Sequence, residues 1–112
     1  MTDMDEWGKD PQVRFLRQAF SLIEKSQGSF LDKIGISIFD ERLRRIRDGA
    51  LTVFERAWGL AARKRMALDE KDMEHLYMFS LAYVLKRYNI TVPDELLPSD
   101  DNAKKLVSEV TR

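Results

Sequence analysis

Two long helical patterns fill residues 36–88 and are joined by a short corner at residues 67–69. In the first pattern, apolar residues recur at spacings of three and four, which places them along one side of a helix. In the second pattern, apolar residues occupy most of the circumference, with Leu81 on one side and Met78 and Phe79 toward the other. A helix without a clearly polar side needs neighbours on more than one face.

These patterns predict an all-α protein, an antiparallel three-helix bundle, because short connections favour antiparallel neighbours. A strand over residues 34–39 is the competing interpretation, but an isolated strand would have no partner. The three principal helices are expected at about 11–25, 37–66 and 70–88, with a short extra helix near 30–34 and a weak C-terminal helix near 103–110.

Residues with known preferences for helix ends set these boundaries. Serine, aspartate and asparagine side chains accept hydrogen bonds from the free amides of a first turn. Glycine and asparagine adopt the left-handed conformation that ends a helix. The expected starts are capped by Ser29, by Ser37 with Asp40, by Asp69 with Asp72, and by Asn102, and the expected ends lie at Gly35 and Asn89.

The predicted helix over residues 37–66 is long for a chain of this size. At about 1.5 Å per residue it measures about 45 Å, whereas a compact domain of about 100 residues has a radius of gyration near 13 Å. A kink at Gly49 or Gly59, or an elongated bundle, would remove the mismatch.

The sequence divides into an acidic flexible arm at 1–9, a helical bundle domain at 10–90 and an extended acidic tail with a short helix at 91–112. Whether residues 89–112 pack on the bundle is left open, because the last helical pattern is short and terminal segments often fray.

Charge and composition restrict the functional classes. The chain has 19 basic and 19 acidic residues, which argues against a globally basic nucleic-acid binder but not against a local basic patch. It has no cysteine, so disulfides and thiolate chemistry are excluded. The first residues lack the pattern of a signal peptide, and no apolar run approaches the roughly 18 residues of a membrane span. A cytoplasmic protein that does not bind membranes is expected.

Arginines gather along one edge of the helix expected at 37–66. Their planar forks suit phosphate recognition, which makes this edge a candidate contact for phosphate or nucleic acid. Two other interpretations are a protein-partner surface and an ordinary flank neutralised by intrahelical pairs such as Asp40 with Arg44. The edge consists of Arg42, Arg45, Arg56 and Arg63.

The second apolar side of the helix at 70–88 is a candidate partner-binding surface. Met78, Phe79 and Ala82 lie opposite the main core face, and Trp58 on the preceding helix is a matching aromatic anchor. Methionine and aromatic side chains adapt well to partners. The alternative is that this helix lies at the centre of the bundle and is covered on both sides by its own chain.

Nothing in the sequence marks an active site. His75 is the single histidine, and although Asp72 and Glu74 lie near it, a metal-binding bundle needs further ligands from other helices. No phosphate loop or nucleophile motif occurs, so neither catalysis nor a cofactor is expected.

The leading hypothesis from the sequence is a non-enzymatic helical interaction module. It would self-associate through the helices at 37–66 and 70–88, most simply as a dimer, or bind another protein. The alternative hypothesis is a nucleic-acid-associated helical protein that uses the arginine edge, and a small enzyme has the least support.

Overall fold

The computed structural model describes residue 21, residues 23–25 and residues 27–112, and these form helices and connecting segments without strands. The prediction of an all-α helical bundle is confirmed, whereas the strand considered for residues 34–39 is absent. The helix expected at 11–25 lies mostly outside the described residues. The elements are a helical segment at 27–33, α3 (Leu43–Arg63), α4 (Glu70–Arg87), the 3-10 turn η1 (Asp94–Leu96) and α5 (Asp101–Val110).

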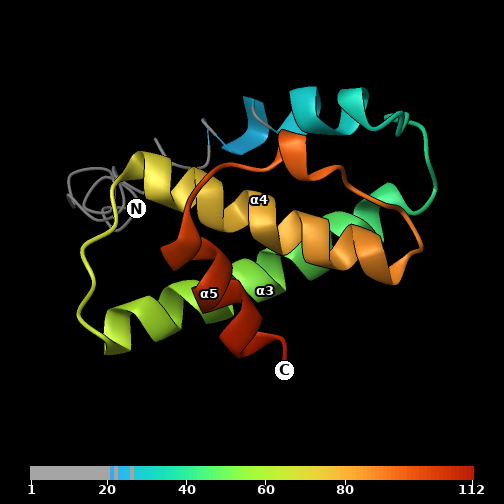
Figure 1. The fold of residues 1–112 in the computed structure, drawn as a ribbon. Coiled ribbons are helices and arrows are strands. Elements are labelled where there is room, and N and C mark those ends of the chain that lie inside the picture. The colour runs from blue at the N-terminus through green and yellow to red at the C-terminus, as the bar shows by residue number, and fades with distance from the viewer. Residues whose placement is uncertain (1–20, 22, 26) are drawn as a thin grey trace, which may run out of the picture.

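Helices α3 and α4 are the most closely packed pair and run in opposite directions (Figure 1). The buried residues of α3 recur at spacings of three and four, as its sequence predicted. Gly49 allows a close approach of the helices, because a Cβ atom there would lie only 3.2 Å from Cγ1 of Val84. This glycine therefore serves helix packing. The buried side chains of α3 are Leu43, Ile46, Ala50, Phe54, Ala57 and Ala61.

Helix α3 begins six residues later than predicted. The expected capping pair of Ser37 and Asp40 does not form, because each side chain closes a local turn instead. The Ser37 Oγ accepts the Phe39 N–H at 3.1 Å, and the Asp40 Oδ1 accepts the Arg42 N–H at 2.8 Å. Since α3 spans 21 residues, it is only about 30 Å long, and no kink is needed to make the bundle compact.

The corner between α3 and α4 matches its sequence signals. The Asp69 carboxylate accepts the Asp72 N–H at 2.8 Å, and the Asp72 carboxylate accepts the Asp69 N–H at 3.1 Å, which completes the predicted capping box. Helix α3 ends at Arg63, followed by Arg65 at a φ of 56°. This left-handed conformation is unfavourable for a side chain other than glycine or asparagine.

The predicted ends at Gly35 and Asn89 are confirmed by positive φ angles of 79° and 62°. The expected start of the short helix at a Ser29 cap is wrong, because residues 27–33 are all helical and Ser29 lies inside this segment. Gln27 and Phe30 are buried on its inner side. Burial of this face outweighs the weak local preference for a break at the serine and glycine.

The C-terminal helix α5 packs across both α3 and α4 (Figure 1). Its apolar side is buried through Ala103, Leu106 and Val107. The cap is Asp100 rather than the expected Asn102, since the Asp100 Oδ1 accepts the Ala103 N–H at 3.0 Å. The question left open by the sequence is thereby answered, because the end of the chain contributes to the core.

Two polar contacts fasten α5 to the other helices. The Asp100 Oδ2 lies 2.9 Å from the Nδ1 of His75 on α4, and the Lys64 Nζ donates to the Glu109 Oε2 at 3.0 Å. Within the described part of the chain, no helix is both long and apolar enough to cross a membrane.

Candidate interaction surfaces

The residues predicted to bind a partner do not form one exposed surface. Phe79 is only 8% exposed, and Met78, Ala82 and Trp58 are half-buried. Phe79 and Ala82 lie in a groove between α4, residues 91–97 and α5, here called the α4–α5 groove. Met78 lines a separate depression beside Phe30. The second apolar side of α4 is thus largely covered by the chain's own C-terminal segment.

Trp58 lies on α3, where its ring stacks against Phe54 at a centroid separation of 6.4 Å and an interplanar angle of 28°. This contact fixes the indole as part of the margin of the core. Partner binding by Trp58, Met78, Phe79 and Ala82 stays a prediction. Only the accessible parts of these side chains could take part in such binding.

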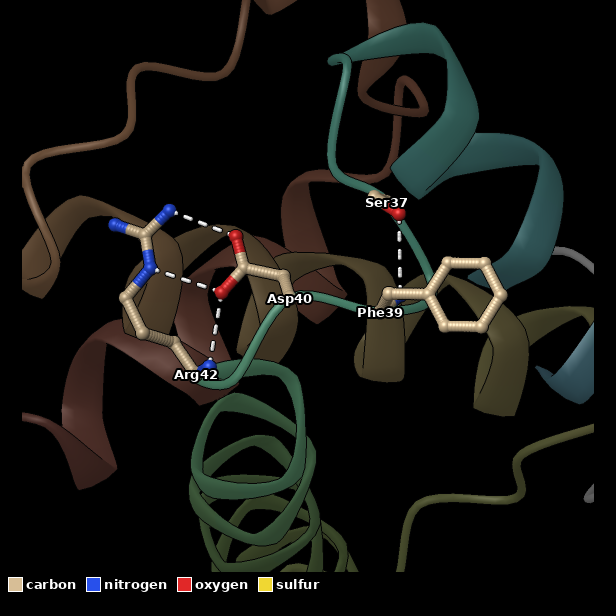
Figure 2. Close-up of polar contacts among 4 residues, drawn as sticks. All are labelled: Ser37, Phe39, Asp40 and Arg42. Atoms are coloured by element: carbon tan, nitrogen blue, oxygen red, sulfur yellow. Dashed lines mark hydrogen bonds and ion pairs between the residues drawn. The ribbon is translucent and has the colours of Figure 1, made fainter.

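The arginine edge is only partly neutralised. Arg42 grips Asp40 with two hydrogen bonds, from Nε to Oδ1 at 3.1 Å and from Nη2 to Oδ2 at 2.9 Å (Figure 2). These bonds lower the pKa of Asp40 to about 2. The expected pair of Asp40 with Arg44 is therefore not formed.

The other three arginines of the edge stay available. Arg45, Arg56 and Arg63 are exposed and form no ion pair with any residue that the structure describes. The Arg63 side chain lies over Gly59, with Nη1 at 3.7 Å from the position a Cβ would take there. With respect to the described residues, the arginine edge thus offers three guanidinium groups without an ion pair along α3, and a salt-bridged flank explains only Arg42.

The turn before α3 carries an exposed apolar pair that sequence reasoning placed inside a helix. Ile38 is 77% exposed and Phe39 is 85% exposed, and they are the large hydrophobic side chains that stand out in the described part of the chain. Figure 2 shows the Phe39 ring pointing away from the side on which Arg42 grips Asp40. The sequence signal that could have indicated this exposed turn is the pair of turn-forming residues, Ser37 and Asp40, that flank Ile38 and Phe39.

Beside this turn lies a groove of about 550 Å³ that shares residues with it, here called the turn groove. Its apolar lining comes from Leu31, Ile36 and Leu43, and Ile38 forms part of its edge. The exposed pair and the turn groove are thus adjacent parts of one surface.

A polar cluster lies between α4, the 27–33 helix and α3, and its tyrosine and glutamine are buried whereas its arginine is exposed. The Tyr77 hydroxyl is hydrogen-bonded to the Gln27 amide. With the amide nitrogen facing Tyr77, the Gln27 oxygen lies 2.6 Å from Nε and 2.9 Å from Nη2 of Arg47. Burial raises the pKa of Tyr77 to about 12, although Arg47 acts in the opposite direction. The phenol therefore stays protonated at neutral pH and satisfies a buried contact.

The polar groups around His75 also have structural partners. Burial raises the pKa of Asp100, but hydrogen bonds from the Ala103 N–H and from His75 outweigh this effect and hold it below its usual range. In the part of the chain that the structure covers, no three histidine, cysteine or acidic side chains gather where they would hold a metal ion.

Comparison of the chain with protein-family models, curated proteins and solved structures finds no match.

Proposed function

We propose that this protein is a non-enzymatic helical interaction module that self-associates through the exposed Ile38–Phe39 turn and the adjacent turn groove. The observation that carries the proposal is the pair of apolar side chains held in water at 77% and 85% exposure. The hydrogen bonds of Ser37 and Asp40 hold this turn in shape. A preorganised contact loses little conformational entropy on binding.

A second copy of the chain suits this surface because the exposed Ile38–Phe39 pair and the turn groove are adjacent. A two-fold axis near the turn would bring each Phe39 over the turn groove of the other copy, as self-complementary dimer contacts require. Four large side chains at about 150 Å² each, with a similar area of groove wall, bury about 1,200 Å² in total. This area lies at the lower limit for specific interfaces, so we expect weak and reversible dimers.

The absence of an enzyme role is supported by how the ionisable groups are used. Among the described residues, Asp69 and Asp100 cap helices, and His75 holds Asp100. Tyr77 stays protonated inside a buried contact. Each of these groups thus has a structural use, at a helix end or in a contact between helices.

Phe39→Asp is expected to abolish self-association while leaving the free energy of unfolding within about 0.5 kcal/mol of the wild type, as for other exposed positions. Sedimentation velocity at tens to hundreds of micromolar should show a concentration-dependent dimer for the wild type and a monomer for this variant. Thr52→Asp, which adds the same charge at an exposed site of α3, is the control and should still dimerise. A wild type that stays monomeric throughout this range contradicts the proposal.

Nucleic-acid binding is the second candidate function. It is favoured because Arg45, Arg56 and Arg63 form no ion pair with a residue that the structure describes. If these side chains contact phosphates, binding to duplex DNA or RNA should weaken steeply as salt is raised. Triple replacement of these arginines by glutamine should remove the binding and its salt dependence. Replacement of Arg42, which is already paired with Asp40, should have a smaller effect. A flat salt response, or no binding at low salt, would exclude this function.

A further inference from the structure

The α4–α5 groove has the size and lining of a ligand site. Its volume is about 480 Å³, within the range of about 300–1,000 Å³ that is typical of small-molecule sites. The floor is apolar: Phe79 and Val107 are buried there, and Ala82, Val92 and Leu97 are half-buried. Its walls come from α4, residues 91–97 and α5.

Two lysine ammonium groups lie at the rim of this groove. Lys86 belongs to the last turn of α4 and Lys104 to α5, and both are exposed. Neither lysine forms an ion pair with a described residue. By contrast, Lys64 is paired with Glu109 of α5. The rim has one acidic residue, Asp94, so its formal charge is positive.

Two of the four hydroxyl groups that line the groove form hydrogen bonds with described residues. The Thr111 Oγ1 donates to the Val107 carbonyl at 2.7 Å, and the Tyr83 hydroxyl accepts from Arg87 at 3.3 Å. The two lysines are the positively charged groups of this lining, and they are therefore the groups that attract an anion. An apolar floor below a cationic rim fits a molecule with an apolar body and an anionic end.

We propose that the α4–α5 groove binds a linear amphipathic carboxylate, such as a fatty acid, with the chain on the Phe79–Val107 floor and the carboxylate at Lys86 and Lys104. A slender chain suits the groove better than a peptide helix. A helix with its side chains is about 10 Å across, so one turn would nearly fill this volume. This binding is independent of the self-association proposed above.

Titration with dodecanoate, kept below its micelle-forming concentration, tests the proposal on the full chain. Heteronuclear NMR should show saturable shifts of the methyl groups of Val92, Leu97 and Val107, with the Ile38 methyl groups unaffected. Dodecyltrimethylammonium has the same tail with the opposite charge and should bind at least fivefold more weakly. Phosphatidylglycerol vesicles provide the second anionic source, and free dodecanoate should compete with any binding to them.

Lys86→Gln with Lys104→Gln should weaken dodecanoate binding by about five- to tenfold, because exposed ion pairs contribute modestly and two are lost. Lys71→Gln with Lys105→Gln is the matched control, since these lysines are also exposed on α4 and α5 but lie outside the groove. The proposal would be overturned if dodecyltrimethylammonium bound as tightly as dodecanoate, or if both double variants lost the same affinity for dodecanoate. Binding to vesicles but not to free dodecanoate, or chemical shift changes confined to Ile38, would also overturn it.

Discussion

Phe79→Asp is expected to lower the free energy of unfolding by more than about 4 kcal/mol, which is most of the roughly 5 kcal/mol that a marginally stable domain has. The side chain is only 8% exposed and lies in the groove floor beside Val107 of α5. A carboxylate placed there loses the burial of the ring, and it must either stay charged in an apolar site or take up a proton.

Urea unfolding followed by circular dichroism measures this change. Phe39→Asp is the matched control, because it makes the same chemical change at a side chain that is 85% exposed. From the sequence alone, Phe79 was a candidate partner-binding residue, whereas in the structure its side chain is buried. The self-association proposed above depends on position 39 instead. If Phe79→Asp is as stable as the wild type, the C-terminal segment does not cover this side of α4.

Helix α4 was predicted closely because its signals are local. Its cap pair, Asp69 and Asp72, lies within four residues, and the asparagine that follows its end adopts the expected left-handed conformation. Such signals depend on neighbouring backbone groups and need no knowledge of the rest of the fold.

The start of α3 was misjudged because its signals are ambiguous. Ser37 and Asp40 favour a helix cap and a local turn for the same reason, since both offer a side-chain oxygen to a nearby N–H. The choice of the turn moves Phe39 from an expected core position to 85% exposure. A shift of a few residues in one helix start thus creates the surface on which the proposed self-association depends.

The candidate sites outside that turn depend on contacts between distant segments. The sequence showed that α4 has a second apolar side, but not that α5 and residues 91–97 would cover it. The same limit applies to the rim of the α4–α5 groove, because Lys86 and Lys104 are 18 positions apart in the sequence and line one groove only through the docking of α5.

Leu106→Ala is expected to lower the free energy of unfolding by about 2–4 kcal/mol, as for other buried leucines replaced by alanine. Leu106 is only 3% exposed and lines a small cavity together with Leu76 of α4 and Met66 of the corner after α3. The shorter side chain would enlarge this cavity where the three segments meet, and the surrounding helices can relax only in part.

Chemical unfolding of Leu106→Ala should remain a single cooperative transition with a lower midpoint, because α5 shares the core of α3 and α4. Lys105→Ala changes the neighbouring exposed residue and should leave the midpoint nearly unchanged. Amide hydrogen exchange separates the alternatives, since an integral α5 opens together with the bundle. If Leu106→Ala speeds exchange only within residues 101–110 while α3 and α4 keep their protection, α5 is a separately fraying tail. The covering of Phe79 by α5 would then contribute little to the free energy of unfolding.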